Sequence, residues 1–355
     1  MTDHHTPISS IGEFGLIDRI RKIVGPGLST VPRNALIMGI GDDAAAYRPS
    51  PGKIQLMTTD ALVEGIHFDL TFTALRHLGW RSMAASFSDI AAMCGVPRYA
   101  TVTLALPQKI TVEMVDDFYT GAVFACREYG CLLVGGDTTA CPGNMMVSVS
   151  VAGEGTEDRI RYRSGARPGD LLCVTGHLGA SLAGLKILQR EKSRFEAASG
   201  QSAFTPNLEP YAAAMEKHFM PKPRLDISAL FEKEVTVSAV IDISDGLASE
   251  VHHLCRAGNC GAQIFEHNLP VIATTQKIAA EFGDPTSMYA LFSGEEYELL
   301  FTMDDKEYEK LEALTGDITI IGRITDNPHQ IELIEESGQP RQLHMTGWDH
   351  FAPRR

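Results

Sequence analysis

Short apolar runs alternate with longer amphipathic stretches along the chain, which predicts strands alternating with helices. In the first half, apolar runs predict strands at 35–40, 53–59, 99–106, 131–134 and 145–151. Longer helical patterns lie at 75–94 and 112–129, and Pro107, Gly130 and Gly143 mark turns between the segments. This alternation is typical of an α/β or α+β protein.

The composition changes in the middle of the chain, where the stretch GEGTEDRIRYRSGARPGD is polar and basic. We place a domain boundary there and predict an N-terminal domain over 1–155 and a C-terminal domain over 156–355. A chain of 355 residues is long enough for two domains of ordinary size. Residues 190–208 show no sustained period, which predicts a mobile loop within the second domain.

The second half repeats the strand–helix alternation. A strand is predicted at 171–175, and a turn at Gly176–Gly179 leads into a helix that runs to Leu188. The segment VIDISDGLAS, at 240–249, predicts another strand that ends at Asp242 and passes directly into a helix. Further strands are predicted at 261–265, up to Phe301 and at 318–321.

Composition and charge argue against several classes of partner. The sequence holds 31 Lys and Arg against 45 Asp and Glu, a net charge of −14. Nucleic acids and anionic membranes bind basic surfaces, so we expect neither as a partner. The polar start MTDHHTPISS has no signal-peptide pattern, and no stretch approaches the roughly 18 apolar residues of a membrane helix. We therefore expect a cytoplasmic protein. The seven cysteines include no Cys-x-x-Cys pair, which predicts reduced, buried thiols.

Five acidic clusters end apolar runs or follow breaks in the chain, and they are the candidate chemistry of this sequence. A single Asp in such a place usually caps a helix or starts a turn, so one cluster alone indicates little. The clusters lie at 41–43, 58–60, 88–89, 135–139 and 242–245.

Asp89 is the only charged residue in the stretch from Ser82 to Pro97. A helix that is apolar on nearly every side is normally buried, and a buried carboxylate is costly unless it is paired or binds a metal ion. We therefore expect Asp89 to face a cleft as a ligand. Asp60 and Asp137 each end an apolar run beside threonines, and such oxygen atoms are the ligands that Mg²⁺ prefers.

Familiar phosphate-binding and nucleophile motifs are missing. The sequence has no GxxxxGK[ST], no kinase Gly-rich loop, no GxSxG and no GxGxxG after a strand. If the chain performs phosphate chemistry, metal ions must therefore neutralise most of the phosphate charge. In VIDISDGLAS, a junction of the kind that binds phosphate carries the carboxylates of Asp242 and Asp245, which is consistent with metal ions between protein and phosphate.

Ten motifs occur in chain order between residues 12 and 351. They are GEFGLI (12–17), GIGDDAA (39–45), TTDALVEGIHF (58–68), SDIAAMCGVP (88–97), GGDTT (135–139), RSGARPGD (163–170), VTGHLGAS (174–181), IDISDGL (241–247), SGEEYELLF (293–301) and GWDHF (347–351). Together they resemble the thiamine-monophosphate kinase family. Aminoimidazole ribonucleotide synthetase and selenophosphate synthetase share the acidic ATP site, but TTDALVEGIHF and SGEEYELLF fit the thiamine branch best.

The resemblance implies an activity and a fold. The chain would transfer the γ-phosphoryl group of ATP to thiamine monophosphate with the help of several Mg²⁺ ions, giving thiamine diphosphate and ADP, the last step of thiamine diphosphate biosynthesis. The fold would be α/β (α+β). An N-terminal ferredoxin-like domain would bind ATP and Mg²⁺ and form a homodimer across its sheet, and a C-terminal α/β domain would complete the active site.

The resemblance also implies roles for individual residues. The Mg²⁺ ligands would be Asp43, Thr58, Thr59, Asp60, Asp89, Asp137, Asp242 and Asp245. ATP would contact Tyr119, Gly136, Asp137, Arg163 and Ser244. Thiamine monophosphate would contact His67, Glu295 and Trp348.

Elementary chemistry agrees with these roles. Both phosphates are anions, so cations and Arg163 must cancel their repulsion before transfer. The acceptor phosphate is already ionised near neutral pH, so no general base is required. Trp348 offers an aromatic face for a thiazolium ring, although a packing anchor for the tail stays open, and His67 can equally be an ordinary histidine at the end of a strand. Glu296 stands where the family often has Asp, so contacts from this position are not carried over.

Two alternatives stay open. A sister enzyme of the same superfamily, such as aminoimidazole ribonucleotide synthetase, would use the same ATP site on another substrate. A non-catalytic metal- or nucleotide-binding protein would keep the fold without turnover. The intact carboxylates in all five clusters favour an enzyme.

Overall fold

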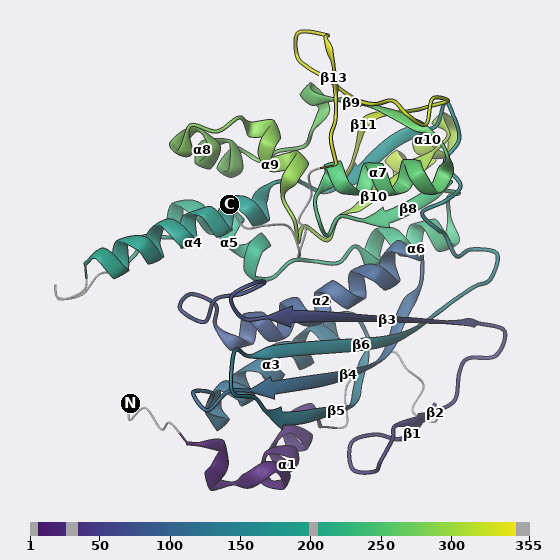
Figure 1. Ribbon diagram of the computed structural model, residues 1–355. Helices are drawn as coiled ribbons and strands as arrows, with labels where there is room; N and C mark the ends of the chain where they lie inside the picture. Colours follow the sequence, from purple (N-terminus) through teal and green to yellow (C-terminus); the bar gives the residue numbers. More distant parts are fainter. Residues whose placement is uncertain (1–5, 26–34, 199–204, 346–355) are drawn as a thin grey trace. The chain divides into compact units, whose positions relative to one another are not determined.

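The computed structural model describes residues 6–25, 35–198 and 205–345 (Figure 1). The chain divides into two compact units, one of Met1–Ile90 with Gly95–Asp158 and one of Ala91–Cys94 with Arg159–Arg355. The chain passes from the first unit to the second after Asp158, inside the polar, basic stretch of the sequence. Within the described part of the chain, none of the helices combines the length and apolar character needed to cross a membrane.

A four-stranded sheet forms the centre of the first unit, with the long helices α2 and α3 against one of its faces (Figure 1). The strand order is β3-β6-β4-β5, in which β4 and β5 are parallel and the other neighbours antiparallel. The elements of this unit are η1 (Ile8–Ser10), α1 (Gly12–Val24), β1 (Leu36–Met38), β2 (Ala46–Tyr47), β3 (Ile54–Val63), α2 (Leu75–Ala92), β4 (Val96–Leu106), α3 (Val112–Glu128), β5 (Leu132–Ala140) and β6 (Met146–Gly155).

The ferredoxin-like label needs a correction at the level of connectivity. From β3 to β6 the elements run β-α-β-α-β-β, whereas the ferredoxin-like fold runs β-α-β-β-α-β. The two arrangements share helices on one face of a four-stranded sheet. The observed order is the one that the sequence pattern predicts from residue 53 onwards, whereas the ferredoxin-like label came from the family resemblance alone.

Over β3, β6 and β4 the other face of this sheet is uncharged in its central rows, and Asp137 of the edge strand β5 continues one of these rows beside Thr103. Along β3, Met57, Thr59 and Ala61 are exposed, whereas the alternate side chains are shielded, as the two-residue period of a strand requires. Their neighbours across β6 and β4 are small or hydroxylic, among them Ser148 and Thr103. Met57, on the edge strand β3, is 84% exposed, which is a large exposure for an apolar side chain.

The helices α2 and α3 pack closely because glycine lies at each contact. A Cβ atom built on Gly79 would lie 2.0 Å from the carbonyl oxygen of Phe118, and one on Gly121 would lie 1.8 Å from that of Arg76. No side chain fits at either position, so the two helix backbones approach through these glycines. The helices in turn bury the shielded face of the sheet.

A seven-stranded sheet in the order β13-β12-β9-β11-β7-β10-β8 forms the second unit. Only β12 and β9 pair in parallel. The elements are β7 (Leu171–Thr175), α4 (Ala180–Ala197), η2 (Glu209–Tyr211), α5 (Ala212–Phe219), α6 (Leu225–Lys233), β8 (Ala239–Asp242), α7 (Leu247–Gly258), β9 (Gly261–Phe265), η3 (Glu266–Asn268), α8 (Ala273–Phe282), α9 (Thr286–Phe292), β10 (Leu299–Met303), α10 (Asp305–Leu314), β11 (Ile318–Thr325), β12 (Ile331–Ile334) and β13 (Pro340–Gln342).

Helices cover both faces of this sheet, and each face has its own hydrophobic core. Leu172 and Val174 of β7 belong to the core under α7, whereas Leu171 and Cys173 belong to the core under α6 and α10. Every residue of β7 is buried. The continuous apolar run that predicted this strand therefore reflects a strand shielded on both sides.

The expected loop at 190–208 is wrong in its first part, because α4 continues to Ala197. Charged residues interrupt the apolar period there without interrupting the helix. Glu191 accepts from Arg190 (Nε, 2.9 Å) and from Arg194 (Nη1, 2.8 Å), and Lys192 lies 3.9 Å from Glu196 one turn later. Such neighbours on a helix surface support a helix that lacks an apolar stripe.

The seven cysteines are free thiols, and all except Cys141 are buried, as expected from the sequence. Two pairs have the same local role. The backbone N–H of Cys131 donates to the carbonyl of Cys126 at the end of α3, and Cys260 donates to Cys255 at the end of α7. With Gly130 and Asn259 in the left-handed conformation, these are Schellman motifs whose apolar contact is made by cysteine.

We expect Gly121→Ala to destabilise the first unit by about 2 kcal/mol, because the added methyl must force α2 and α3 apart. Thermal or urea unfolding checks this value. Gly143→Ala is the matched control, since a Cβ atom there meets nothing within 4 Å. Equal stability of the two variants would contradict the close helix contact.

Candidate functional site

Two carboxylates of the first unit lie between β3 and α2, where both elements are partly shielded from solvent. Asp89 of α2 accepts a hydrogen bond from the Thr58 hydroxyl of β3. Asp60, two residues along the same face of β3, accepts from the Ser86 hydroxyl of α2 at 2.6 Å. Asp89 is therefore half-buried beside polar partners, and the expectation that it faces a cleft as a ligand stays a prediction.

The two carboxylates repel one another. Burial, together with the negative charge of Asp89, raises the pKa of Asp60 to about 6, although the hydrogen bond from Ser86 lowers it. Part of Asp60 is therefore protonated near pH 6 in the protein alone. A divalent cation near both groups would favour the ionised form of each.

Asp60 and Asp137 lie inside strands, whereas the sequence suggested that they follow strand ends. The strand β3 continues to Val63 and β5 continues to Ala140. The apolar run stops earlier because polar residues occupy alternate positions of each strand. The hydroxyl of Thr59 consequently bonds to the Val149 carbonyl (3.1 Å) and the Ser150 hydroxyl (3.0 Å) of β6, not to the Asp60–Asp89 pair.

On β5, Gly136 and Asp137 lie next to β4. A Cβ atom on Gly136 would lie 2.0 Å from the Val102 carbonyl oxygen, so this position excludes any side chain. Asp137 is exposed and is in register with Thr103. Tyr119 of α3 is 2% exposed, and burial and the charge of Asp137 raise its pKa. Its contact with ATP stays a prediction, since core packing already accounts for a buried tyrosine.

His67 and Asp43 occupy loops of the first unit. The ring of His67 follows β3 and is half-buried, and its Nδ1 accepts the Val63 backbone N–H at 3.0 Å. A neutral ring therefore carries its proton on Nε2. Asp43 is exposed in the turn between β1 and β2, where its backbone N–H donates to Asp42 at 2.9 Å. Trp348 lies outside the described residues.

In the second unit, VIDISDGLAS forms the predicted junction between a strand and a helix. Asp242 is the last residue of β8 and is 3% exposed, and α7 begins at Leu247. Between them, Ser244 and Asp245 form a half-buried turn, and Gly246 has the positive φ of 112° that the turn requires.

Glu250 of α7 is an acidic residue of this junction that the sequence reasoning missed. Its Oε1 accepts the Asp245 backbone N–H at 3.1 Å, and Glu250 is 3% exposed. Burial raises its pKa to about 7, with Asp245 adding to the rise and Arg163 opposing it. Arg163 therefore lies within electrostatic range of the junction. The sequence could have indicated Glu250, because it lies one turn into the helix that follows Ser244-Asp245-Gly246. From such a position a carboxylate can accept hydrogen bonds from the free N–H groups at the helix start.

Residues 293–298 lie against this junction. The backbone N–H of Glu295 donates to the Ser244 carbonyl at 2.7 Å, and that of Tyr297 donates to the Ile243 carbonyl at 2.9 Å. Glu295 and Tyr297 both have left-handed backbone conformations, with φ of 56° and 53°. Such conformations are uncommon outside glycine and are retained where the surroundings hold them in place.

The donor atoms of both units are compatible with Mg²⁺. Within the described ranges, no group of three or more His, Cys, Asp or Glu side chains surrounds one metal position. Carboxylates instead repel one another in pairs, Asp60 with Asp89 and Asp245 with Glu250. Carboxylate and hydroxyl oxygens are hard ligands, and repulsion of this kind is relieved by a divalent cation.

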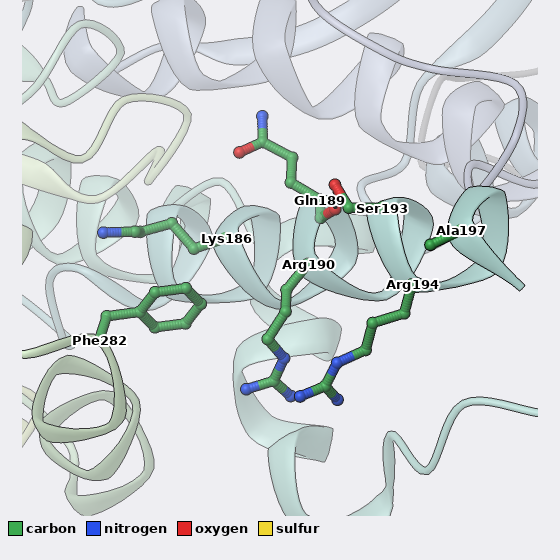
Figure 2. A pocket seen from close by; sticks show the side chains of 7 residues that line it. All are labelled: Lys186, Gln189, Arg190, Ser193, Arg194, Ala197 and Phe282. Atoms are coloured by element: carbon green, nitrogen blue, oxygen red, sulfur yellow. Dashed lines mark hydrogen bonds between the residues drawn. The ribbon is translucent and has the colours of Figure 1, made fainter.

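A groove of about 510 Å³ along α4 has a different chemistry (Figure 2). Lys186, Arg190 and Arg194 line it together with Phe282, and the Lys186 ammonium lies 4.7 Å from the Phe282 ring centre. Each cation already has an acidic partner, which is Asp284, Glu281 or Glu191. The acidic clusters therefore remain the candidate site.

Comparison with known proteins identifies the family. Residues 41–155 match the model for the N-terminal domain of AIR synthase related proteins, and residues 167–334 match that for the C-terminal domain. The thiamine-monophosphate kinase of Bacillus subtilis is 31% identical over 96% of this chain and 99% of its own length. The chain belongs to the thiamine-monophosphate kinase family. The Synechococcus elongatus relative is 35% identical over 88% of this chain and 91% of its own length.

Solved structures agree with this membership. Thiamine-monophosphate kinase from Stenotrophomonas maltophilia superposes with a TM-score of 0.77 at 28% identity, covering 93% of this chain and 98% of that one. AaThiL complexed with AMPPCP and TMP superposes with a TM-score of 0.73 at 31% identity, covering 98% and 100%. A hydrogenase maturation protein complexed with ATP, at 19% identity, shares the fold.

We expect Asp60→Asn to raise the melting temperature of the metal-free enzyme at pH 7. Because the folded-state pKa lies above the ordinary 3.8, wild-type stability falls as the pH rises from about 4 to about 6. Asparagine removes this penalty, of the order of 1 kcal/mol after solvent screening. The gain in melting temperature should shrink near pH 4. Turnover of Asp60→Asn should be at least about tenfold lower than that of the wild type.

Thermal melts at pH 4.5 and 7, in EDTA, test this expectation. Asp43→Asn is the control, since Asp43 is exposed and should leave the melting temperature unchanged. A lower melting temperature for Asp60→Asn at pH 7 would show that the carboxylate stabilises the fold without metal.

Proposed function

We propose that this chain transfers the γ-phosphoryl group of ATP to thiamine monophosphate, giving thiamine diphosphate and ADP. The observation that carries the proposal is the pair Asp60 and Asp89, which interact between β3 and α2 at positions that the resemblance assigns to Mg²⁺ ligands. The relatives that span almost the whole chain are thiamine-monophosphate kinases. The solved structure of one relative, AaThiL, is a complex with both AMPPCP, an ATP analogue, and TMP.

The chain's own residues divide the work of transfer. Asp43, Thr58, Thr59, Asp60, Asp89, Asp137, Asp242 and Asp245 are the proposed Mg²⁺ ligands. When bound, Mg²⁺ neutralises the phosphates and withdraws charge from the transferred group. Arg163 adds positive charge beside the Ser244–Asp245 turn, and Tyr119, Gly136 and Ser244 contact the nucleotide. His67, Glu295 and Trp348 hold the acceptor. Alignment of the two phosphates, not proton transfer, supplies most of the catalysis.

We also propose that two copies associate through the open face of the first sheet. This face exposes Met57 among small and hydroxylic side chains of β3, β6 and β4, and it carries Asp137 at its β5 edge. A sheet face that is free of charge over three of its four strands is suited to packing on its own copy. The cytoplasmic location stays a prediction.

A sister activity on the same ATP site remains the alternative, and no observation favours it. The TTDALVEGIHF segment places His67 beside β3, and SGEEYELLF places Glu295 beside the Ser244 turn. Both segments belong to the thiamine branch of the resemblance.

We expect the purified protein to convert thiamine monophosphate to thiamine diphosphate with ATP and Mg²⁺. Chromatography of the thiamine esters measures the product. Asp137→Asn should reduce turnover at least about tenfold, equal to about 1.4 kcal/mol of transition-state stabilisation. Glu336→Gln, an exposed residue of the second unit, is the control that keeps full activity. If no thiamine diphosphate forms at saturating thiamine monophosphate and another acceptor is phosphorylated instead, the chain has a sister activity.

We expect Met57→Arg to convert a dimer to a monomer, because paired sheets would bury like charges against one another. Light scattering after size exclusion measures the mass of each form. Lys310→Arg, an exposed change on α10, is the control that leaves the mass unchanged. A monomeric wild-type protein, or a dimeric Met57→Arg variant, would show that this face is not the interface.

A further inference from the structure

Glu296, between the two residues of left-handed conformation, is fully buried. Its Oε1 accepts from the Ser293 hydroxyl at 2.5 Å and from the Ser181 backbone N–H at 3.1 Å. Its Oε2 is buried without a hydrogen-bond partner, and the Lys217 ammonium lies 3.9 Å away. A buried carboxylate with this few donors is costly, so the surrounding fold must hold it in place.

The start of α4 depends on the same segment. Gly179 precedes this helix and has no side chain to cap it. The free N–H groups are satisfied instead from a distant part of the chain, with Ser181 donating to Glu296 and Leu182 donating to the Ser293 hydroxyl at 3.0 Å. A negative charge at a helix N-terminus is stabilised by these N–H groups and by the helix dipole. Residues 293–296 are thereby fixed to a rigid element.

Glu298 fixes the other end of the segment. Its carboxylate accepts from Lys217, from Arg224 at 2.9 Å and from the Thr175 hydroxyl at 2.6 Å. A Cβ atom on Gly176 would lie 2.5 Å from Glu298 Oε1, so the turn after β7 leaves just enough room for this group. Lys217 of α5 therefore holds both buried carboxylates.

The two residues that flank Glu296 bind the turn at Ser244. The backbone N–H groups of Glu295 and Tyr297 donate to the carbonyls of Ser244 and Ile243. Ile243 in turn donates its N–H to the Glu298 carbonyl at 2.8 Å. With Glu296 and Glu298 fixed in the interior, the backbone of Glu295 has one position relative to the Ser244 turn.

We propose that Glu296 is a positioning residue for phosphoryl transfer. Through Ser293, Lys217 and the start of α4, it fixes Glu295, on the acceptor side, against Ser244, on the nucleotide side. This role rests on the proposed function, since it concerns the alignment of those two substrates. Displacement of one reactant by about 1 Å can reduce a rate as much as a hundredfold, while binding changes little.

A general stabilising role for the buried charges makes a different prediction. Loss of stability alone lowers the amount of folded enzyme but leaves the reaction of each folded molecule unchanged. Misalignment instead slows transfer to the acceptor and leaves the γ-phosphoryl group open to attack by water. The ratio of ADP formed to thiamine diphosphate formed therefore separates the two roles.

The test uses Glu296→Gln, which keeps an acceptor oxygen for Ser293 and Ser181 but removes the charge. We expect kcat to fall at least about tenfold, the KM values of both substrates to stay within about threefold, and the ADP to thiamine diphosphate ratio to rise at least about twofold. Glu296→Asp should recover part of the rate. Arg190→Gln is the matched control, because it removes an ion pair of α4 that does not touch residues 293–298. Its ratio should equal that of the wild type.

An unchanged ratio in Glu296→Gln, or the same rise in Arg190→Gln, would overturn the positioning role. If Glu296→Gln does not fold, Ser293→Ala, which removes the hydroxyl between Glu296 and Leu182, is judged by the same ratio. Wild-type turnover is measured first. Its absence contradicts the proposed function itself, whereas a normal wild type with a normal Glu296→Gln contradicts only this inference.

Discussion

Repulsion between neighbouring carboxylates is the physical constraint on which the candidate site depends. In the first unit it acts between Asp60 and Asp89, and in the second between Asp245 and Glu250. Burial is the larger cause that raises the pKa of Asp60 to about 6 and that of Glu250 to about 7, and the neighbouring carboxylate adds to the rise in each pair. Holding these charges close together lowers the stability of the fold. Bound cations would relieve the repulsion and would at the same time bind phosphate.

The rigid elements around each pair explain how the cost is sustained. The glycine contacts between α2 and α3 place α2 firmly on its sheet, so Asp89 cannot withdraw from β3. In the second unit the SDG turn is held by Glu250 from one side and by residues 293–298 from the other. The proposed ligands are therefore positioned by the fold itself, which is the arrangement that catalysis by alignment requires.

Sequence patterns predicted the α/β class, most strands and the junction at 240–249, because buried strands and a turn with glycine leave clear local signals. They placed Asp60 and Asp137 after strands instead of inside them, since polar residues on one face of a strand end the apolar run. The outer half of α4 was missed for a similar reason, as its Arg190 and Arg194 replace the apolar period by ion pairs.

The parts that sequence could not supply are those made by distant residues. Ser86 on Asp60, and Lys217 between Glu296 and Glu298, come from segments far apart in the chain, and no spacing rule connects them. Strand order in the first unit likewise depends on pairing between distant segments. The ferredoxin-like label was wrong in connectivity because it came from the resemblance, whereas the sequence pattern itself predicted the observed order of elements. The roles of the individual ligands rest on resemblance, and geometry supports most directly those of Asp60 and Asp89.

Calorimetric titration with AMPPCP, with and without Mg²⁺, tests the central claim most directly. If carboxylates hold the phosphates only through divalent cations, affinity for the analogue should rise at least about a hundredfold with Mg²⁺, equal to about 2.7 kcal/mol. In EDTA the acidic clusters should repel the analogue. Equal affinity in EDTA and in Mg²⁺ would contradict the account, because it would mean that the protein's own groups bind the phosphates.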